Sequence, residues 1–228
     1  MLREVVLGVN DLVLRLRRSQ RIRPEMTPVR VNLGSALLAA PGWINIDASP
    51  TLLVAGRPTW IQKVAYRFSR GPSDADFAQY EKDLRVGRFV HHDLTDSIPM
   101  PDRSADFIYS SHFLEHLSPG EGQRLLHECL RVLRPGGIVR ICVPDLSIAV
   151  RFYLEGDRSR FLNYFFTEDR GAHHRHRYMY DFELLSQALG AAGFAKVERC
   201  SYRSGRVPDL DVLDNRPDET LFVEAMRP

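Results

Sequence analysis

Three side chains that can carry protons stand close together at His112, Glu115 and His116, directly after an apolar run. Imidazole and carboxylate groups are common general acids and bases, and a well-placed one contributes about 10²–10⁴-fold in rate. We therefore predict these three residues as catalytic candidates, with His112 nearest the reacting group. The alternative is that Glu115 caps the following helix and His116 makes a structural contact.

A second stretch of interest is Val29–Asp47, where an apolar run, a glycine turn and a second apolar run end in a carboxylate. Gly34 permits a sharp turn and leaves room for a ligand against the main chain. Asp47 can accept hydrogen bonds from both hydroxyls of a ribose. The pattern is typical of the opening of a nucleotide-binding α/β sheet, in which ligands sit at the carboxyl ends of the strands.

Alternating apolar runs and amphipathic segments position these residues. Only eight residues, 34–41, join the first two strands, so a full crossover helix is not expected there. Ser73 is expected to cap the helix that starts at Asp74. We predict strands over 29–33, 43–46, 88–91, 106–109 and 138–143, followed by an antiparallel pair over 195–202 and 221–226. We predict helices over 2–18, 51–69, 74–85, 122–133, 147–166 and 181–192.

The composition is that of a globular protein, with 44% hydrophobic and 26% charged residues in a chain of 228. A net charge of +2 gives no electrostatic case for nucleic-acid binding. The three cysteines indicate free thiols in a reducing compartment. No apolar run approaches membrane-spanning length and the first residues do not form a secretory signal, so we expect a cytoplasmic protein.

Residues 1–28 contain an amphipathic helix that is rich in arginine near its end. We expect this helix and a helical insertion over 48–86 to form a lid over the acceptor side. In that arrangement Val5, Val9 and Leu12 would pack on Trp60, Val64 and Phe68. The alternative is a basic amphipathic helix lying on a membrane surface, which is possible but not expected.

Several motifs occur in a characteristic order over Val29–Asp145: N-L-G-S-A, P-G-W-I-N-I-D, H-D-L, D-F-I-Y-S-S-H-F-L-E-H-L and R-V-L-R-P-G-G. In combination they resemble the class I S-adenosylmethionine (SAM)-dependent methyltransferases of the type 11 group. The resemblance implies an α/β, Rossmann-like fold over 29–228. Its seven-stranded, mostly parallel sheet would have the order 3-2-1-4-5-7-6, with strand seven antiparallel and helices on both faces.

The resemblance also implies how SAM would be bound as the cofactor. Asn32 stands where many relatives have an acid, and Ala36 replaces the second glycine of Gly-x-Gly, where a positive φ would strain an alanine. The implied cofactor-binding residues are Asn32 before the glycine turn, Gly34, Ser35 and Ala36 along the methionine part, Asp47 at the ribose, Asp93 and Leu94 at the adenine, and Ser110 and Ser111 beside the sulfonium.

The function that follows is methyl transfer from SAM to a small-molecule or saccharide acceptor. A catalytically silent SAM-binding or scaffolding protein is the alternative that Asn32 and Ala36 favour. A nicotinamide oxidoreductase is disfavoured because the glycine turn lacks a third glycine and Asp47 follows Gly34 by only thirteen residues. The acceptor and the oligomeric state are left open.

Two further motifs bear on metal binding. His112–His116 matches H-x-x-E-H, a metalloprotease pattern, but it lies inside the methyltransferase signature, so we expect no metal there. The cluster Gly171–Arg177 could bind a metal or an anionic group, or could be a solvated loop. Tyr178, Tyr180 and Asp181, which follow it, could line the acceptor pocket.

Overall fold

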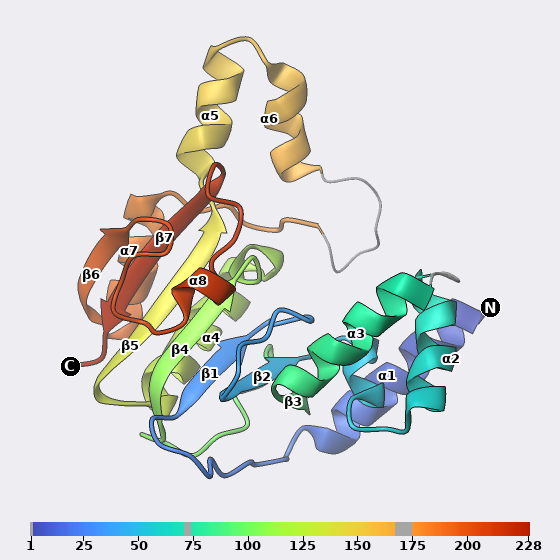
Figure 1. Ribbon diagram of the computed structural model, residues 1–228. Coiled ribbons are helices and arrows are strands. Elements are labelled where there is room, and N and C mark those ends of the chain that lie inside the picture. The colour runs from blue at the N-terminus through green and yellow to red at the C-terminus, as the bar shows by residue number, and fades with distance from the viewer. Residues whose placement is uncertain (1, 71–73, 167–174) are drawn as a thin grey trace.

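The computed structural model describes residues 2–70, 74–166 and 175–228. Its centre is a seven-stranded sheet in the order β3-β2-β1-β4-β5-β7-β6 (Figure 1). Strand β7 runs antiparallel to both β5 and β6, while the other neighbouring pairs are parallel. The predicted fold class, strand order and antiparallel strand are confirmed. The strands are β1 (Arg30–Leu33), β2 (Trp43–Asp47), β3 (Arg88–His91), β4 (Ala105–Ser111), β5 (Leu133–Pro144), β6 (Ala195–Cys200) and β7 (Thr220–Met226).

The parallel strands end in register, which brings distant parts of the sequence to one edge of the sheet. Leu33 of β1 pairs with Ile46 of β2 and with Ser110 of β4. Asp47 pairs with His91, and Ser111 pairs with Cys142. The residues that directly follow these strand ends, such as Gly34 after β1 and His112 after β4, therefore lie at the same carboxyl edge, as predicted.

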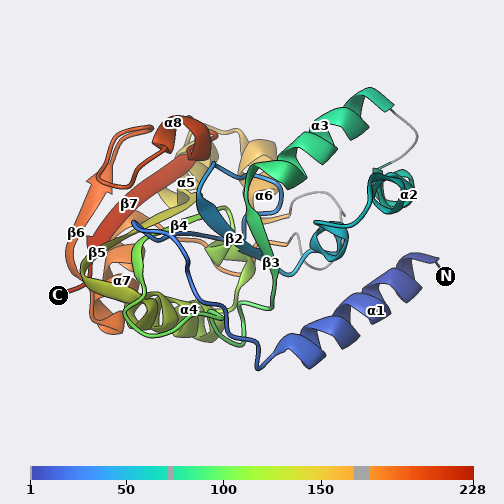
Figure 2. The same ribbon diagram turned by 60° about the horizontal axis from the view of Figure 1, so that its bottom comes forward.

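Helices cover both faces of the sheet (Figure 2). Leu125 and Leu126 of α4 and Leu185 and Leu189 of α7 belong to the main core on one face. On the other face, the short helix α8 covers a smaller core that contains Trp43. The α-helices are α1 (Leu2–Arg17), α2 (Thr59–Arg70), α3 (Asp74–Val86), α4 (Pro119–Val132), α5 (Leu146–Leu154), α6 (Arg158–Phe165), α7 (Phe182–Ala192) and α8 (Leu210–Leu213), and the 3-10 turns are η1 (Pro50–Val54) and η2 (Leu114–His116).

A buried ion-pair network joins β5 to the C-terminal part of the fold. The Arg140 guanidinium is fully buried, 2.6 Å from Asp214 and 3.2 Å from Glu224. It also donates to the backbone carbonyls of Ser201 and Ser204. A buried guanidinium is tolerated when paired and hydrogen-bonded, and here both conditions are met.

Two predicted helices are each broken in the structure. The predicted helix 51–69 is η1 followed by α2, separated by Gly56, which has a φ of +73°, and by Pro58. The predicted helix 147–166 is α5 followed by α6, with Gly156 at a φ of +89° between them. Left-handed glycine ends a helix, and proline cannot continue one. The predicted cap at Ser73 lies outside the described residues.

Helix α1 lies beyond the edge strand β3, and α2 and α3 also lie on that side of the sheet (Figures 1 and 2). Asn10 connects α1 to the sheet by donating to the Ala48 carbonyl and by contacting His91 at 2.8 Å. The predicted mutual burial of apolar residues is wrong, because Leu12 is 57% exposed and Trp60 69% exposed. Polar contacts hold α1 at the sheet edge instead. The lid role of these segments stays a prediction.

Candidate functional site

The loop after β1 is tied to the end of β2 through Asp47. One carboxylate oxygen accepts from the Ala36 amide at 2.9 Å, and the other accepts from the Ser49 amide at 2.6 Å. Burial raises the pKa of Asp47 above its ordinary value, although the two amides act to lower it. Asp47, whose carboxylate was predicted to bind a ribose, thus holds the loop that contains Gly34 in place.

Gly34 occupies a position that only glycine fits. Its φ is +64°, and a Cβ there would overlap the side chain of Phe113. The sequence predicted that the absent side chain leaves room for a ligand, and this is wrong for the space above Gly34, which the Phe113 ring fills. The same contact connects the loop after β1 to the segment after β4.

Two departures from the family pattern have structural consequences. Ala36 has a φ of +45°, in the left-handed region that disfavours residues with a Cβ. The Asn32 side chain is buried and donates to Asn45 and to the Leu38 carbonyl, so it supports the loop from beneath. Asn32, which stands where many relatives have an acid, therefore stabilises the backbone of this loop through neutral hydrogen bonds.

The remaining predicted cofactor residues lie at strand ends. One oxygen of Asp93 accepts from the amide and hydroxyl of Thr95, while Leu94 is buried. The Ser110 hydroxyl is buried without a hydrogen-bond partner, whereas Ser111 accepts weakly from Asn215 at 3.4 Å. Their cofactor-binding roles stay predictions.

The three catalytic candidates form one cluster. His112 has a φ of +50°, and its Nε2 lies 3.0 Å from the Thr220 hydroxyl. Its Nδ1 lies 3.4 Å from Glu115 Oε1. The His116 Nε2 lies 3.9 Å from the same oxygen, so both imidazoles face one carboxylate. Thr220 was not predicted, and no local sequence pattern marks this threonine at the start of β7 as part of a site.

Glu115 does not cap the helix that follows it. Ser118 is the N-cap of α4, and it forms a capping box with Glu121. The Glu115 carboxylate is fully buried, and neither of its oxygens has a hydrogen-bond partner. The alternative in which Glu115 acts as a cap is therefore wrong.

The end of the predicted histidine cluster, together with Tyr178, packs against Glu115. The amides of Arg177 and Tyr178 donate to the Glu115 carbonyl. His176 stacks near His116, with ring centroids 5.3 Å apart, and burial lowers its pKa. The first part of the predicted cluster, residues 171–174, lies outside the described residues. Tyr180 is buried and packs against Tyr178, and Asp181 caps α7, so their acceptor-lining role stays a prediction.

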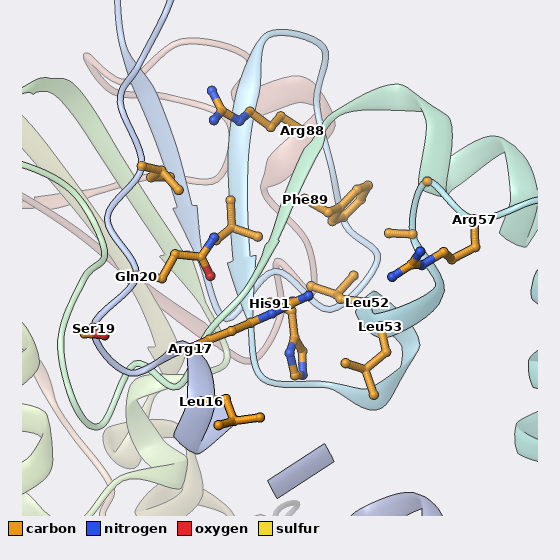
Figure 3. A pocket seen from close by; sticks show the side chains of 14 residues that line it. Leu16, Arg17, Ser19, Gln20, Leu52, Leu53, Arg57, Arg88, Phe89 and His91 are labelled. Atoms are coloured by element: carbon orange, nitrogen blue, oxygen red, sulfur yellow. The ribbon is translucent and has the colours of Figure 1, made fainter. Parts of the chain in front are cut away.

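A cavity of about 610 Å³ lies elsewhere, along β3 between the end of α1 and η1 (Figure 3). Arg17, Arg57 and Arg88 line it together with His91. In Figure 3, Arg17 and Arg57 extend toward the cavity from different elements. None of the residues predicted to bind the cofactor or to act in catalysis lines this cavity.

Comparisons with known proteins agree with the predicted family. The family described as "Methyltransferase domain" (type 11) matches residues 62–141. A demethylmenaquinone methyltransferase of Clavibacter sepedonicus is 32% identical over 153 residues, 63% of this chain and 61% of that protein. A tRNA N(3)-cytidine methyltransferase of Danio rerio is 34% identical over 100 residues, 37% of this chain and 28% of that protein. The chain thus spans less than two thirds of the length of these relatives.

A solved structure shares the fold. The apo form of the SAM-dependent methyltransferase SibL matches with a TM-score of 0.51 at 19% identity, over 100% of this chain and 57% of that one. Together with the family match, this confirms the predicted resemblance to class I SAM-dependent methyltransferases, and SAM is the cofactor that this class implies. Among the described helices, none is long and apolar enough to cross a membrane.

The residues at the carboxyl edge fit such a cofactor. The loop from Gly34 to Ala36 is already ordered against Asp47. The buried Ser110 hydroxyl, which lacks a partner, lies beside Leu33 across the sheet. A cofactor lying along this edge would supply the missing hydrogen-bond partner.

Proposed function

We propose that the protein transfers a methyl group from SAM to a small-molecule or saccharide acceptor. The observation that carries the proposal is the ordered loop from Gly34 to Ala36, tied to Asp47 at the same sheet edge as Ser110 and His112. The family match and the named relatives support the reaction class. By their names, those relatives act on demethylmenaquinone and on a cytidine of tRNA, so the reaction class does not fix the acceptor.

When bound, SAM supplies a methyl group already activated by its sulfonium. The protein mainly positions the acceptor in line with it, which is worth about 7–11 kcal/mol in well-oriented cases. Asp47 and the Gly34 loop would bind and orient the cofactor. His112 would act as the general base toward an oxygen acceptor, with its ring held between the Thr220 hydroxyl at Nε2 and the Glu115 carboxylate at Nδ1.

Calorimetric titration with S-adenosylhomocysteine, the demethylated product, tests cofactor binding. Asp47→Ala should weaken binding by roughly 1.5–3 kcal/mol, the range for hydrogen bonds to a charged group. Asp211→Ala, at an exposed residue of α8, is the matched control and should bind as the wild type. Absence of binding at millimolar product would refute the proposal.

The second candidate function is a SAM-binding protein without turnover. The left-handed Ala36 and the Phe113 ring over Gly34 favour it, because both restrict the cofactor's approach. Transfer of a labelled methyl group to any member of a panel of small-molecule and saccharide acceptors would exclude it. Tight product binding with no transfer across the panel would support it.

A further inference from the structure

Glu115, His116 and His176 bring three metal-ligating atoms together. The ligating atoms of these residues all lie within 4.8 Å of one another. Glu115 and His116 come from η2, whereas His176 comes from the segment before α7. Ligands in a metal site of ordinary bond length lie roughly 3–4 Å apart, so small side-chain rotations would close the set around an ion.

The hydrogen bonds of the two histidines fix the tautomer that a metal requires. The His116 Nδ1 lies 3.1 Å from the Arg175 carbonyl, and the His176 Nδ1 contacts the Tyr164 carbonyl. A carbonyl only accepts, so each Nδ1 carries a proton, and in the neutral ring the lone pair is then on Nε2. Metal-ligating histidines are oriented in this way, with the second ring nitrogen donating to a backbone carbonyl or a carboxylate.

The Glu115 carboxylate supplies the independent observation. It is fully buried, and both of its oxygens lack hydrogen-bond partners. A buried carboxylate without a hydrogen bond is costly, and a bound cation removes that cost. The His112 Nδ1 lies 3.4 Å and the His116 Nε2 3.9 Å from the Glu115 Oε1.

We propose that Glu115, His116 and His176 form a binding site for a divalent transition-metal ion of the zinc type. Two imidazoles and one carboxylate are a ligand set that suits such ions and leaves a coordination position for water or a substrate oxygen. The expectation of no metal from sequence considered H-x-x-E-H alone. In the structure, His112 is not the partner of His116 in this set, and His176 takes its place.

The test is calorimetric titration of the chelator-treated 228-residue chain with Zn²⁺, with elemental analysis after removal of free metal. The wild type should retain one Zn²⁺ per chain, and Mg²⁺ should bind far more weakly because imidazole ligands do not suit it. Glu115→Gln and His176→Ala should each weaken Zn²⁺ binding by about 100-fold or more, since even residues that only support a ligand are worth 10–100-fold.

Two controls separate this site from other histidines. His127→Ala removes an exposed histidine of α4 and should leave Zn²⁺ binding unchanged. The double variant His173→Ala, His174→Ala removes the neighbouring histidines outside the described residues and should retain the bound ion. Circular dichroism and product binding verify that each variant is folded. No Zn²⁺ uptake by the wild type would overturn the proposal, and so would equal losses in His176→Ala and His127→Ala.

Discussion

The carboxyl edge of the sheet has two halves, one at β1 to β3 and one after β4, and each contains a carboxylate with a different hydrogen-bonding environment. At the end of β2, Asp47 accepts from two backbone amides and orders the loop after β1. After β4, Glu115 is fully buried and accepts no hydrogen bond. We call the first half the complete half, because its carboxylate already has hydrogen-bond donors within the protein. Substitutions there should therefore lower the stability of the fold. The second half contains a buried carboxylate without a hydrogen-bond donor, which a ligand rather than the fold would satisfy.

The largest effect is expected for Gly34→Ala. The new methyl group would meet the Phe113 ring and would also impose a Cβ at a φ of +64°, so the free energy of unfolding should fall by about 3 kcal/mol or more. Urea unfolding measures it. Gly56→Ala is the matched control, since Gly56 has a φ of +73° but no atom near its Cβ position, and it should lose only about 1 kcal/mol. Similar losses of unfolding free energy in the two variants would show that the Phe113 side chain moves aside at little cost, and would contradict the prediction.

A pH dependence is expected from His91, which ends β3 in the complete half. Burial, with Arg17 nearby, lowers the pKa of His91 to about 4, so below pH 6.5 the unfolded chain binds more protons than the folded protein. Stability from this group is present near pH 7 and is lost as the pH falls from 6.5 toward 4. At pH 4.5 the loss should reach about 2–3 kcal/mol.

Comparison with His91→Gln isolates this contribution from that of other titrating groups. The glutamine variant retains a donor for Asn10 but does not titrate. The difference in unfolding free energy between pH 7 and pH 4.5 should be smaller in the variant than in the wild type. An identical difference in both proteins would show that His91 does not contribute.

Ala36→Gly should raise stability. Ala36 has a φ of +45°, which costs an alanine about 1–2 kcal/mol and costs glycine almost nothing. After the greater entropy of glycine in the unfolded chain is subtracted, a gain of about 0.5–1 kcal/mol remains. Ala55→Gly, at a φ of −58°, should lose stability instead. A loss in both variants would argue against strain at position 36.

The smallest effect is expected for Glu115→Gln in the presence of a chelator. The substitution replaces a buried carboxyl group that has no hydrogen-bond partner by a neutral amide of similar shape, so the free energy of unfolding should change by less than about 0.5 kcal/mol or should rise. Asp47→Asn, in the complete half, should lose more because it weakens bonds from two amides. A loss above about 2 kcal/mol in Glu115→Gln would remove the contrast between the halves.

The sheet could be predicted from the sequence because its signals are local or carried by the family pattern. Buried apolar runs mark the strands, and the motif from Gly34 to Asp47 marks the turn between two of them. Boundaries were less accurate where glycine and proline interrupt a periodic segment, as at Gly56 and Gly156. Helix α8 was missed because four residues show too little periodicity.

The site was predictable only in part. Sequence patterns placed His112, Glu115 and His116 together, but they could not show which imidazole nitrogen faces the carboxylate. The contact of Phe113 with Gly34 and that of His112 with Thr220 join residues far apart in the chain, and no spacing rule indicates them. Such contacts follow from the register of the sheet, which forms only in the folded molecule.

The ion-pair network around Arg140 determines when β5 can be buried during synthesis of the chain. Arg140 belongs to β5, but its partners follow it by 61 to 84 residues. At about 5–20 residues per second, a ribosome needs roughly 4–17 s to add the last of them. Until Asp214 is added, 74 residues after Arg140, the guanidinium has neither of its two carboxylate partners and must stay in water. Strand β5 is therefore among the last to be buried, although more than half of the chain already exists when it emerges.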